Sequence, residues 1–194
     1  MEPKMDRTCT AFAGTKQIAT GDVIEVALKV KKYLKDDGKE NVLIFDDVTS
    51  AQVELDLRGT TEAVTRRLEA LREPGEKKTG PGRPKLGVVS KEVTLLPQHW
   101  EWLALQPGGA SVTLRKLIEE AKKKNFTKDQ IRQAQEAVYK FMHAIAGDLP
   151  NYEEALRAMY AYDTKQFKKM IADWPKDLQE HILKVGREAL ANVK

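Results

Sequence analysis

Apolar and polar residues in the first third of the chain recur with the spacings of short strands and amphipathic helices. Residues 8–13 and 17–20 are predicted to be the two strands of a hairpin. Apolar residues then recur every three or four positions over 23–34, which predicts a helix. Asp22 and Glu25 have the spacing of a capping box at the start of that helix.

Two more strand patterns and a helix pattern complete this region. Residues 42–45 form a continuous apolar run, which is typical of a buried strand. Residues 53–58 alternate between apolar and charged side chains, which is typical of a half-exposed strand. A further helix is predicted from about Thr61. We therefore expect residues 1–73 to form a ββαββα domain.

The middle of the chain begins with a stretch that lacks apolar residues at the spacing of a strand or a helix. Residues 74–87 are rich in Pro, Gly and Lys, and such a composition predicts a flexible basic linker. Residues 88–96 are then predicted to be a strand and Pro97 the first residue of a helix, with Ser111 as the cap of a second helix. A strand and two helices thus occupy 88–124.

The last third of the chain is predicted to be a bundle of helices. Capping-box spacings at Thr127 and Gln130, and again at Asn151 and Glu154, precede apolar residues at helical intervals. Residues 125–194 are therefore expected to form a C-terminal helical domain. The whole chain is predicted to belong to the α+β class.

The composition argues against a membrane protein, a secreted protein and a disulfide-rich protein. The 194 residues are 41% hydrophobic and 32% charged, and no apolar run approaches the roughly 18 residues of a membrane helix. The first residues lack an apolar signal-peptide core, so we expect a cytoplasmic protein with no membrane partner. A single cysteine and three scattered histidines predict no disulfide framework, no metal site and no cofactor.

The net charge of +4 is concentrated in the middle of the chain. Residues 74–124 contain ten basic and five acidic side chains, whereas residues 1–73 carry a net charge of −2 and residues 125–194 a net charge of +1. A local basic block is expected of a protein that binds phosphate groups, although a solvated lysine-rich linker has the same composition.

The segment from Gly87 to Lys124 resembles a ribbon-helix-helix DNA-binding domain. The resemblance rests on the strand 89–96, the helix that starts at Pro97, the glycine turn at 108–109 and the helix after it. It implies a homodimer in which the strands Val88–Leu96 of two chains pair into a ribbon that enters the major groove of double-stranded DNA. The alternative is a strand–helix–helix element packed within one chain.

Immediately before this segment, Gly82-Arg83-Pro84-Lys85 resembles the core of an AT-hook. This resemblance implies an extended arm in the narrow minor groove of A·T-rich DNA. With the basic and helix-capping side chains nearby, the predicted DNA contacts are Lys77, Lys78, Arg83, Pro84, Lys85, Lys91, Thr94, Ser111, Thr113 and Arg115.

The carboxylates, the cysteine and the histidines of the chain are weaker candidates for functional residues. Asp46, Asp47, Glu54 and Asp56 gather carboxylates that a divalent cation would accept, but strand alternation and turn chemistry favour a surface role. Cys9 is predicted to be a buried thiol. His99 and His181 are predicted to be exposed on helices. No arrangement of catalytic residues is found, so we do not expect an enzyme.

Several short motifs spread over the chain resemble a bacterial family of uncharacterised proteins, the domain-of-unknown-function 2239 family. They are Cys9-Thr-Ala-Phe-Ala-Gly14, Val42-Leu-Ile-Phe-Asp-Asp47, Leu55-Asp-Leu-Arg-Gly59, Gly82-Arg-Pro-Lys-Leu-Gly-Val88, Glu92-Val-Thr-Leu-Leu-Pro97, Gln106-Pro-Gly-Gly109 and Ala146-Gly-Asp-Leu-Pro150. The resemblance implies a bacterial origin and no particular activity.

The sequence therefore favours a dimeric bacterial DNA-binding protein, either a transcriptional regulator or a nucleoid-associated factor. Two alternatives remain open. One is a protein-interaction adaptor in which the basic linker is only a tether. The other is a small-molecule-binding protein or an enzyme housed in residues 1–73, with a pocket near Asp46, Asp47 and Arg58.

Overall fold

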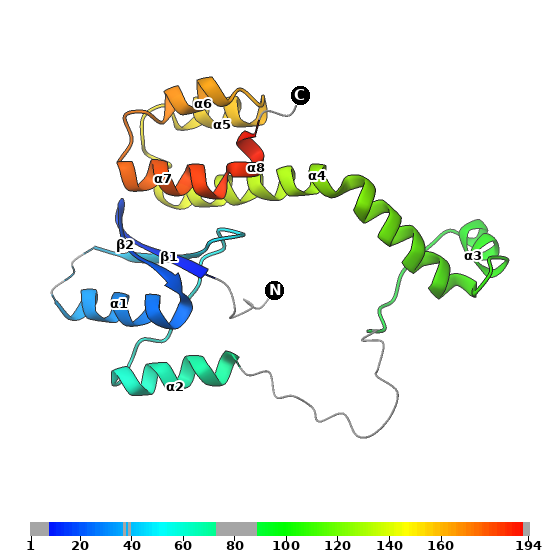
Figure 1. Cartoon of the computed structure of the whole chain (residues 1–194), viewed down its shortest axis with the longest axis horizontal. Helices are drawn as coiled ribbons and strands as arrows, with labels where there is room; N and C mark the ends of the chain where they lie inside the picture. The colour runs from blue at the N-terminus through cyan, green and yellow to red at the C-terminus, as the bar shows by residue number, and fades with distance from the viewer. Residues whose placement is uncertain (1–7, 37, 39, 73–88, 192–194) are drawn as a thin grey trace. The chain divides into compact units, whose positions relative to one another are not determined.

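The computed structural model describes residues 8–36, 38, 40–72 and 89–191. This part of the chain has a mixed α+β fold with a three-stranded antiparallel sheet and eight helices (Figure 1). The expected linker over 74–87 lies outside the described residues.

The sheet is built from the N-terminal part of the chain. Its strands are β1 (Thr8–Ala13), β2 (Lys16–Asp22) and β3 (Val42–Asp46), in the order β2-β1-β3. Both neighbouring pairs are antiparallel. The tight β1–β2 turn places Gly14 at φ +53°, a conformation that glycine adopts without steric cost. The hairpin and the buried strand predicted from the sequence are thus confirmed.

Helices make up most of the remaining described chain. They are α1 (Val23–Lys35), α2 (Thr61–Arg72), α3 (Pro97–Ala104), α4 (Gly109–Ile145), α5 (Tyr152–Tyr160), α6 (Thr164–Met170), α7 (Lys176–Val185) and α8 (Arg187–Leu190).

Helix α1 covers one face of the sheet. Its predicted start is confirmed, because the Asp22 carboxylate accepts a hydrogen bond from the backbone N–H of Ile24 at 2.9 Å. The inner residues of α1 pack against side chains from all three strands, including Cys9 and Ile44. These contacts bury the helical stripe that the sequence predicted.

The opposite face of the sheet is covered by C-terminal helices. Phe12 of β1 and Phe45 of β3 belong to the same buried cluster as Phe141 of α4 and Ile182 of α7. The Phe141 ring lies 5.1 Å from the Phe12 ring and 5.0 Å from the Phe45 ring, centre to centre. Successive residues of β3 therefore face two different cores, and this explains why its first four positions, 42–45, are all apolar.

Polar contacts also join the sheet to α7. The backbone N–H of Gln17 donates to the Asp177 carboxylate at 2.8 Å, and the Lys184 amine donates to the Asp47 carboxylate at 2.8 Å. The hydroxyl of Thr10 donates to the other oxygen of Asp47 at 2.6 Å. Asp47, which directly follows the edge strand β3, thus links the central strand β1 to Lys184 of α7, 137 residues further along the chain.

The chain divides into two compact units. One comprises residues 1–75 together with 130–194, and the other comprises residues 76–129, so the residues of α4 are shared between them. This grouping differs from the separate N-terminal and C-terminal domains expected from the sequence. The difference arises because the second face of the sheet is apolar and requires the C-terminal helices to bury it.

Two predicted strands do not appear within the single chain. Residues 53–58 are extended and contribute one backbone hydrogen bond, from the Val53 N–H to the Ile44 carbonyl at 2.8 Å, but they form no strand. Leu55 and Leu57 instead pack against the α1 and α2 clusters. Residues 89–96 are irregular. A ribbon formed between two chains requires a second copy, so that pairing stays a prediction.

The helix boundaries around residue 110 and residue 127 also differ from expectation. Helix α4 begins at Gly109, which places Ser111 inside its first turn rather than at its cap, and it continues through Thr127 without a break. No Gly or Pro lies between residues 110 and 145, so nothing in the covalent chain terminates the helix there. The N-terminal proline of α3 and the start of α5 after Asn151 agree with the prediction.

Candidate nucleic-acid interface

The predicted DNA-binding residues fall into three groups in the structure. The first group, the basic arm, lies outside the described residues: Lys77, Lys78, Arg83, Pro84 and Lys85. The second group lies on the irregular segment before α3, and the third lies on the first two turns of α4.

The segment before α3 presents its side chains to solvent. Lys91 and Thr94 are both exposed, as is Glu92 between them. Val89 and Val93 are exposed as well, at 78% and 57%. Apolar and polar residues of this segment are therefore equally accessible, so neither face of the predicted strand is buried within one chain.

The start of α4 presents a mixed surface. Arg115 is exposed, and its Nε–H donates to the Ser111 carbonyl at 3.0 Å, which holds the guanidinium beside the first turn of the helix. Ser111 is exposed, whereas Thr113 is buried. The Thr113 hydroxyl is therefore a poor candidate for a direct phosphate contact. The backbone N–H groups of the first turn belong to residues 109–112.

Beyond this turn, one long stretch of α4 is exposed on all sides. Every residue from Arg115 to Lys128 is solvent-accessible, and six charged side chains besides these two lie within it. Basic residues outnumber acidic ones, and three consecutive lysines stand at 122–124. These lysines were not among the predicted contacts, although their position in the basic block was visible in the sequence.

Large apolar side chains are unusually exposed in the same unit. Within the described residues 89–129, Leu103 is the one hydrophobic side chain in the buried core. The exposed large hydrophobic residues of this stretch are Val89, Val93, Leu96, Trp100, Trp102, Leu105, Leu117, Ile118 and Phe126. Trp100 of α3 and both Leu117 and Ile118 of α4 are among them, so in a single chain the apolar faces of these helices are uncovered.

Part of this apolar surface forms a pocket. Leu95, His99, Trp102, Leu103, Leu114 and Leu117 surround a volume of about 240 Å³ between the segment before α3, α3 itself and the start of α4. The residues that line it are almost all apolar. Such a pocket accepts an apolar side chain rather than a phosphate group.

Two of the three side chains singled out for possible chemistry, Cys9 and His181, are buried in the unit formed by residues 1–75 and 130–194, whereas His99 lies in the unit of residues 76–129. Burial, reinforced by the charges of Asp46 and Asp47, raises the pKa of the Cys9 thiol to about 11, so the thiol is protonated at neutral pH. His99 is exposed as predicted. His181 was predicted to be exposed, but it is 2% accessible and lies between the rings of Phe12 and Phe141. Its charged sequence neighbours concealed the inward direction of its side chain.

The carboxylates that a cation would accept are used for local structure. Asp46 is buried, and it accepts hydrogen bonds from the backbone N–H of Val48 at 3.0 Å and of Thr49 at 2.7 Å. Asp56 is held by Arg58 and Arg67. The turn chemistry predicted for Asp46 is confirmed, because its side chain closes the turn after β3, but its predicted surface position is wrong, because the side chain is buried. Within the described ranges, no three His, Cys, Asp or Glu side chains form a group able to hold a metal ion.

None of the helices that the structure describes is long and apolar enough to cross a bilayer. The described residues define an α+β protein that has one unit with a sheet buried on both faces and a second unit with exposed basic and apolar side chains. Residues 8–186 match the model of the DUF2239 family, described as uncharacterized protein conserved in bacteria, and the chain belongs to this family. No curated protein and no solved structure shows a significant match to the chain.

Proposed function

We propose that the chain is a dimeric bacterial DNA-binding protein that acts as a transcriptional regulator or as a nucleoid-associated factor. The observation that carries the proposal is the uncovered apolar surface of residues 89–129, which lies within the same unit as the basic block. A second copy of the chain would cover the apolar side chains, and the basic side chains would then flank the paired segments.

Energetic reasoning supports the need for a partner. A unit of about 50 residues buries too small a fraction of its surface to be stable alone. Here the described part of the unit buries Leu103 and leaves both tryptophans at least 42% exposed. Pairing of Val88–Leu96 between two chains would satisfy the backbone of that segment and remove Val89 or Val93 from water.

The charge distribution supports DNA as the ligand. Lys91, Arg115 and the lysines at 122–124 are exposed, and the arm at 82–85 precedes them in the chain. In the proposed complex the arm lies in a minor groove, the ribbon lies in the adjacent major groove, and the remaining basic side chains contact phosphates. Such binding is dominated by the release of counterions from DNA.

A titration of labelled duplex at two salt concentrations tests this proposal. If Z basic side chains neutralise phosphates, the logarithm of the affinity should fall against the logarithm of the salt concentration with a slope of about −0.9Z. Micromolar protein should bind the duplex at low salt. Absence of binding under those conditions would reject DNA binding altogether.

The basic arm is tested by the double variant Arg83→Ala/Lys85→Ala. We expect weaker binding to all duplexes, a shallower salt dependence, and the largest loss for A·T-rich DNA, because the arm is proposed to occupy a narrow minor groove. The matched control is Lys168→Ala/Lys169→Ala, which removes the same charge from the exposed end of α6. Equal affinities for the two double variants would remove the arm from the proposal.

A protein-interaction adaptor is the second candidate function. The pocket beside Trp102 favours it, because this pocket is formed within one chain and takes an apolar side chain. In that case the chain would be a monomer and would bind no DNA. The molar mass of the full chain in solution distinguishes the two functions, because the DNA-binding proposal requires a dimer.

A further inference from the structure

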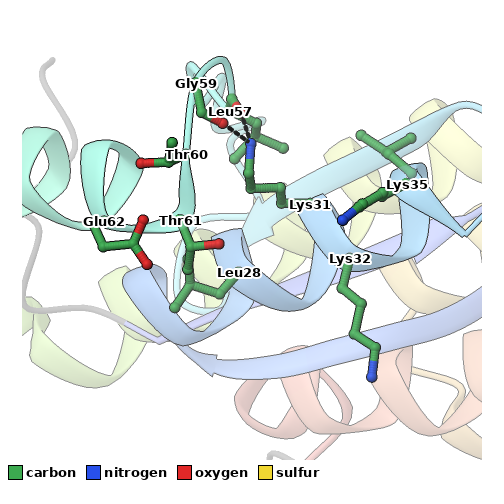
Figure 2. A pocket seen from close by; sticks show the side chains of 10 residues that line it. Leu28, Lys31, Lys32, Lys35, Leu57, Gly59, Thr60, Thr61 and Glu62 are labelled. Carbon is green, nitrogen blue, oxygen red and sulfur yellow. Dashed lines mark hydrogen bonds between the residues drawn. The ribbon is translucent and has the colours of Figure 1, made fainter.

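A pocket in the larger unit has an apolar floor and a cationic wall. It lies between the C-terminal half of α1, the loop before α2 and the first residues of α2, and its volume is about 800 Å³ (Figure 2). Leu28, Leu34 and Leu57 supply apolar surface, while Lys31 and Lys35 supply positive charge. Ligand pockets of this size typically combine an apolar lining with a few placed polar groups.

Lys31 is fixed in position at this pocket. Its amine donates to the carbonyl oxygens of Leu57 and Gly59, each at 2.6 Å, as the dashed lines in Figure 2 show. An ammonium group has three donors, so one N–H remains for a ligand. The two carbonyls carry no net charge, and Lys31 makes no ion pair with a carboxylate of the described chain.

A second cation stands on the same wall one helical turn later. Lys35 follows Lys31 at the i,i+4 spacing that places side chains on one face of a helix. Lys35 is exposed, and it too forms no ion pair within the ranges that the structure describes. Two uncompensated lysines on one helix face repel each other, and an anion between them relieves that repulsion.

The acidic residue that lines this pocket, Glu62, makes no ion pair with Lys31 or Lys35 in the described part of the chain. Glu62 lies at the start of α2, and a hydrogen bond from its own backbone N–H, together with one from the Thr60 hydroxyl, lowers the pKa of its carboxyl group. The Glu62 carboxylate therefore caps the N-terminus of α2. The pocket's affinity for anions must come from the α1 lysines rather than from the end of that helix.

We infer that this pocket binds an amphiphilic anion, meaning a carboxylate or a phosphate monoester attached to an apolar chain. The head group lies between Lys31 and Lys35, and the chain lies against Leu28 and Leu57. A free inorganic anion gains nothing from the leucines, and an uncharged chain gains nothing from the lysines. Both parts of the ligand are therefore needed. This inference concerns the larger unit and does not depend on DNA binding.

Isothermal titration of the full chain with four probes tests the inference, with the two amphiphilic anions kept below their micelle-forming concentrations and the alcohol below its solubility limit. The probes are decanoate, decyl phosphate, 1-decanol and inorganic phosphate. We expect saturable binding of decanoate and decyl phosphate at one site, with at least about tenfold weaker binding of 1-decanol and of inorganic phosphate. Equal affinity for decanoate and 1-decanol, or equal affinity for decyl phosphate and inorganic phosphate, would overturn it.

Variants then locate the site. Lys35→Met removes one cation without touching the hydrogen bonds of Lys31, and we expect it to weaken decanoate binding about three- to tenfold. The matched control is Lys29→Met, which removes the same charge from α1 at a residue outside the pocket. Thr61→Phe places a ring at the exposed opening and should also weaken binding. Identical affinities for the Lys35 and Lys29 variants would place the ligand elsewhere and refute the assignment.

Discussion

At the scale of single residues, His181 is the most informative side chain. It is buried against Phe12 and Phe141, and its Nε2 atom has no hydrogen-bond partner within the described structure. A neutral imidazole can be tolerated among aromatic rings, but an imidazolium there has lost its hydration. Burial lowers the pKa of His181 to about 4, with the Asp47 charge opposing this change and the Lys184 charge adding to it.

This burial predicts acid destabilisation. The folded-state pKa lies below the ordinary value of 6.5, so the unfolded chain binds more protons, and stability falls as the pH drops from 6.5 towards 4. The loss attributable to His181 should be about 2 kcal/mol at pH 5 relative to neutral pH. Urea unfolding of His181→Phe should show this part of the pH dependence removed.

Carboxylates contribute a separate acid dependence, so the comparison must be made between variants. Burial tends to raise the pKa of Asp47, but the hydrogen bonds from Lys184 and Thr10 outweigh it and the net change is downward. The contribution of Asp47 to the pH dependence is present in the wild type, in His181→Phe and in a control variant, His99→Phe. His99→Phe changes an exposed histidine and should leave the pH dependence intact. If the free energy of unfolding of His181→Phe fell with decreasing pH as steeply as that of the wild type, the acid destabilisation could not be attributed to the burial of His181.

At the scale of secondary-structure elements, the sequence predicted the sheet better than it predicted α4. Strands β1 and β3 and the cap of α1 could be predicted because short runs, turns and a capping aspartate each leave a local signal. The break near Thr127 was wrong because capping residues also occur inside helices. Burial of His181 and the packing of α7 on the sheet depend on contacts more than 100 residues apart, which local patterns do not contain.

The candidate interface was predictable only in part. Basic residues and a glycine turn are visible in the sequence, so Lys91 and Arg115 could be selected correctly as exposed cations. Burial of Thr113 could not be foreseen, because it depends on which face of α4 meets α3. The α1–α2 pocket was also missed, because Lys31 and Gly59 are brought together only by the fold.

The continuity of α4 leads to a prediction about its local stability. One face of residues 134–145 is buried in the core, whereas residues 115–128 are exposed on every side. Tertiary packing supplies most helix stability, so the exposed stretch should open far more often. At protein concentrations where the chain is monomeric, amide hydrogen exchange should be at least about a hundredfold faster over 115–128 than over 134–145. Uniform protection along α4 would show that a partner covers the exposed stretch, even in dilute solution.

At the scale of the whole molecule, the two units differ in how completely they bury their apolar side chains. The sheet unit packs aromatic rings on one face and α1 on the other. The unit of residues 76–129 leaves its largest described apolar side chains in water, including Trp102 at 50% and Leu105 at 83%. Patches of this kind mark interaction surfaces. Self-association is the explanation that we propose, because a second copy of the chain would cover these side chains.

Light scattering of the full chain should therefore give a mass of about 44 kDa, twice the 21.9 kDa of one chain. Leu117→Glu/Ile118→Glu places two carboxylates on the apolar face of α4 and should shift the mass to that of a monomer, because each charge would have to be buried without a partner. Leu71→Glu alters an equally accessible leucine on α2 and should leave the dimer intact.

Circular dichroism separates dissociation from unfolding in this experiment. The sheet unit does not use Leu117 or Ile118 in its core, so the double variant should retain the helical signal of that unit. If dimerisation builds the DNA-binding surface, the same variant should lose duplex binding although every predicted DNA contact is still present. A monomeric wild type would exclude the paired ribbon and would leave the adaptor function, whereas a dimer that survives the double substitution would place the interface elsewhere on the chain.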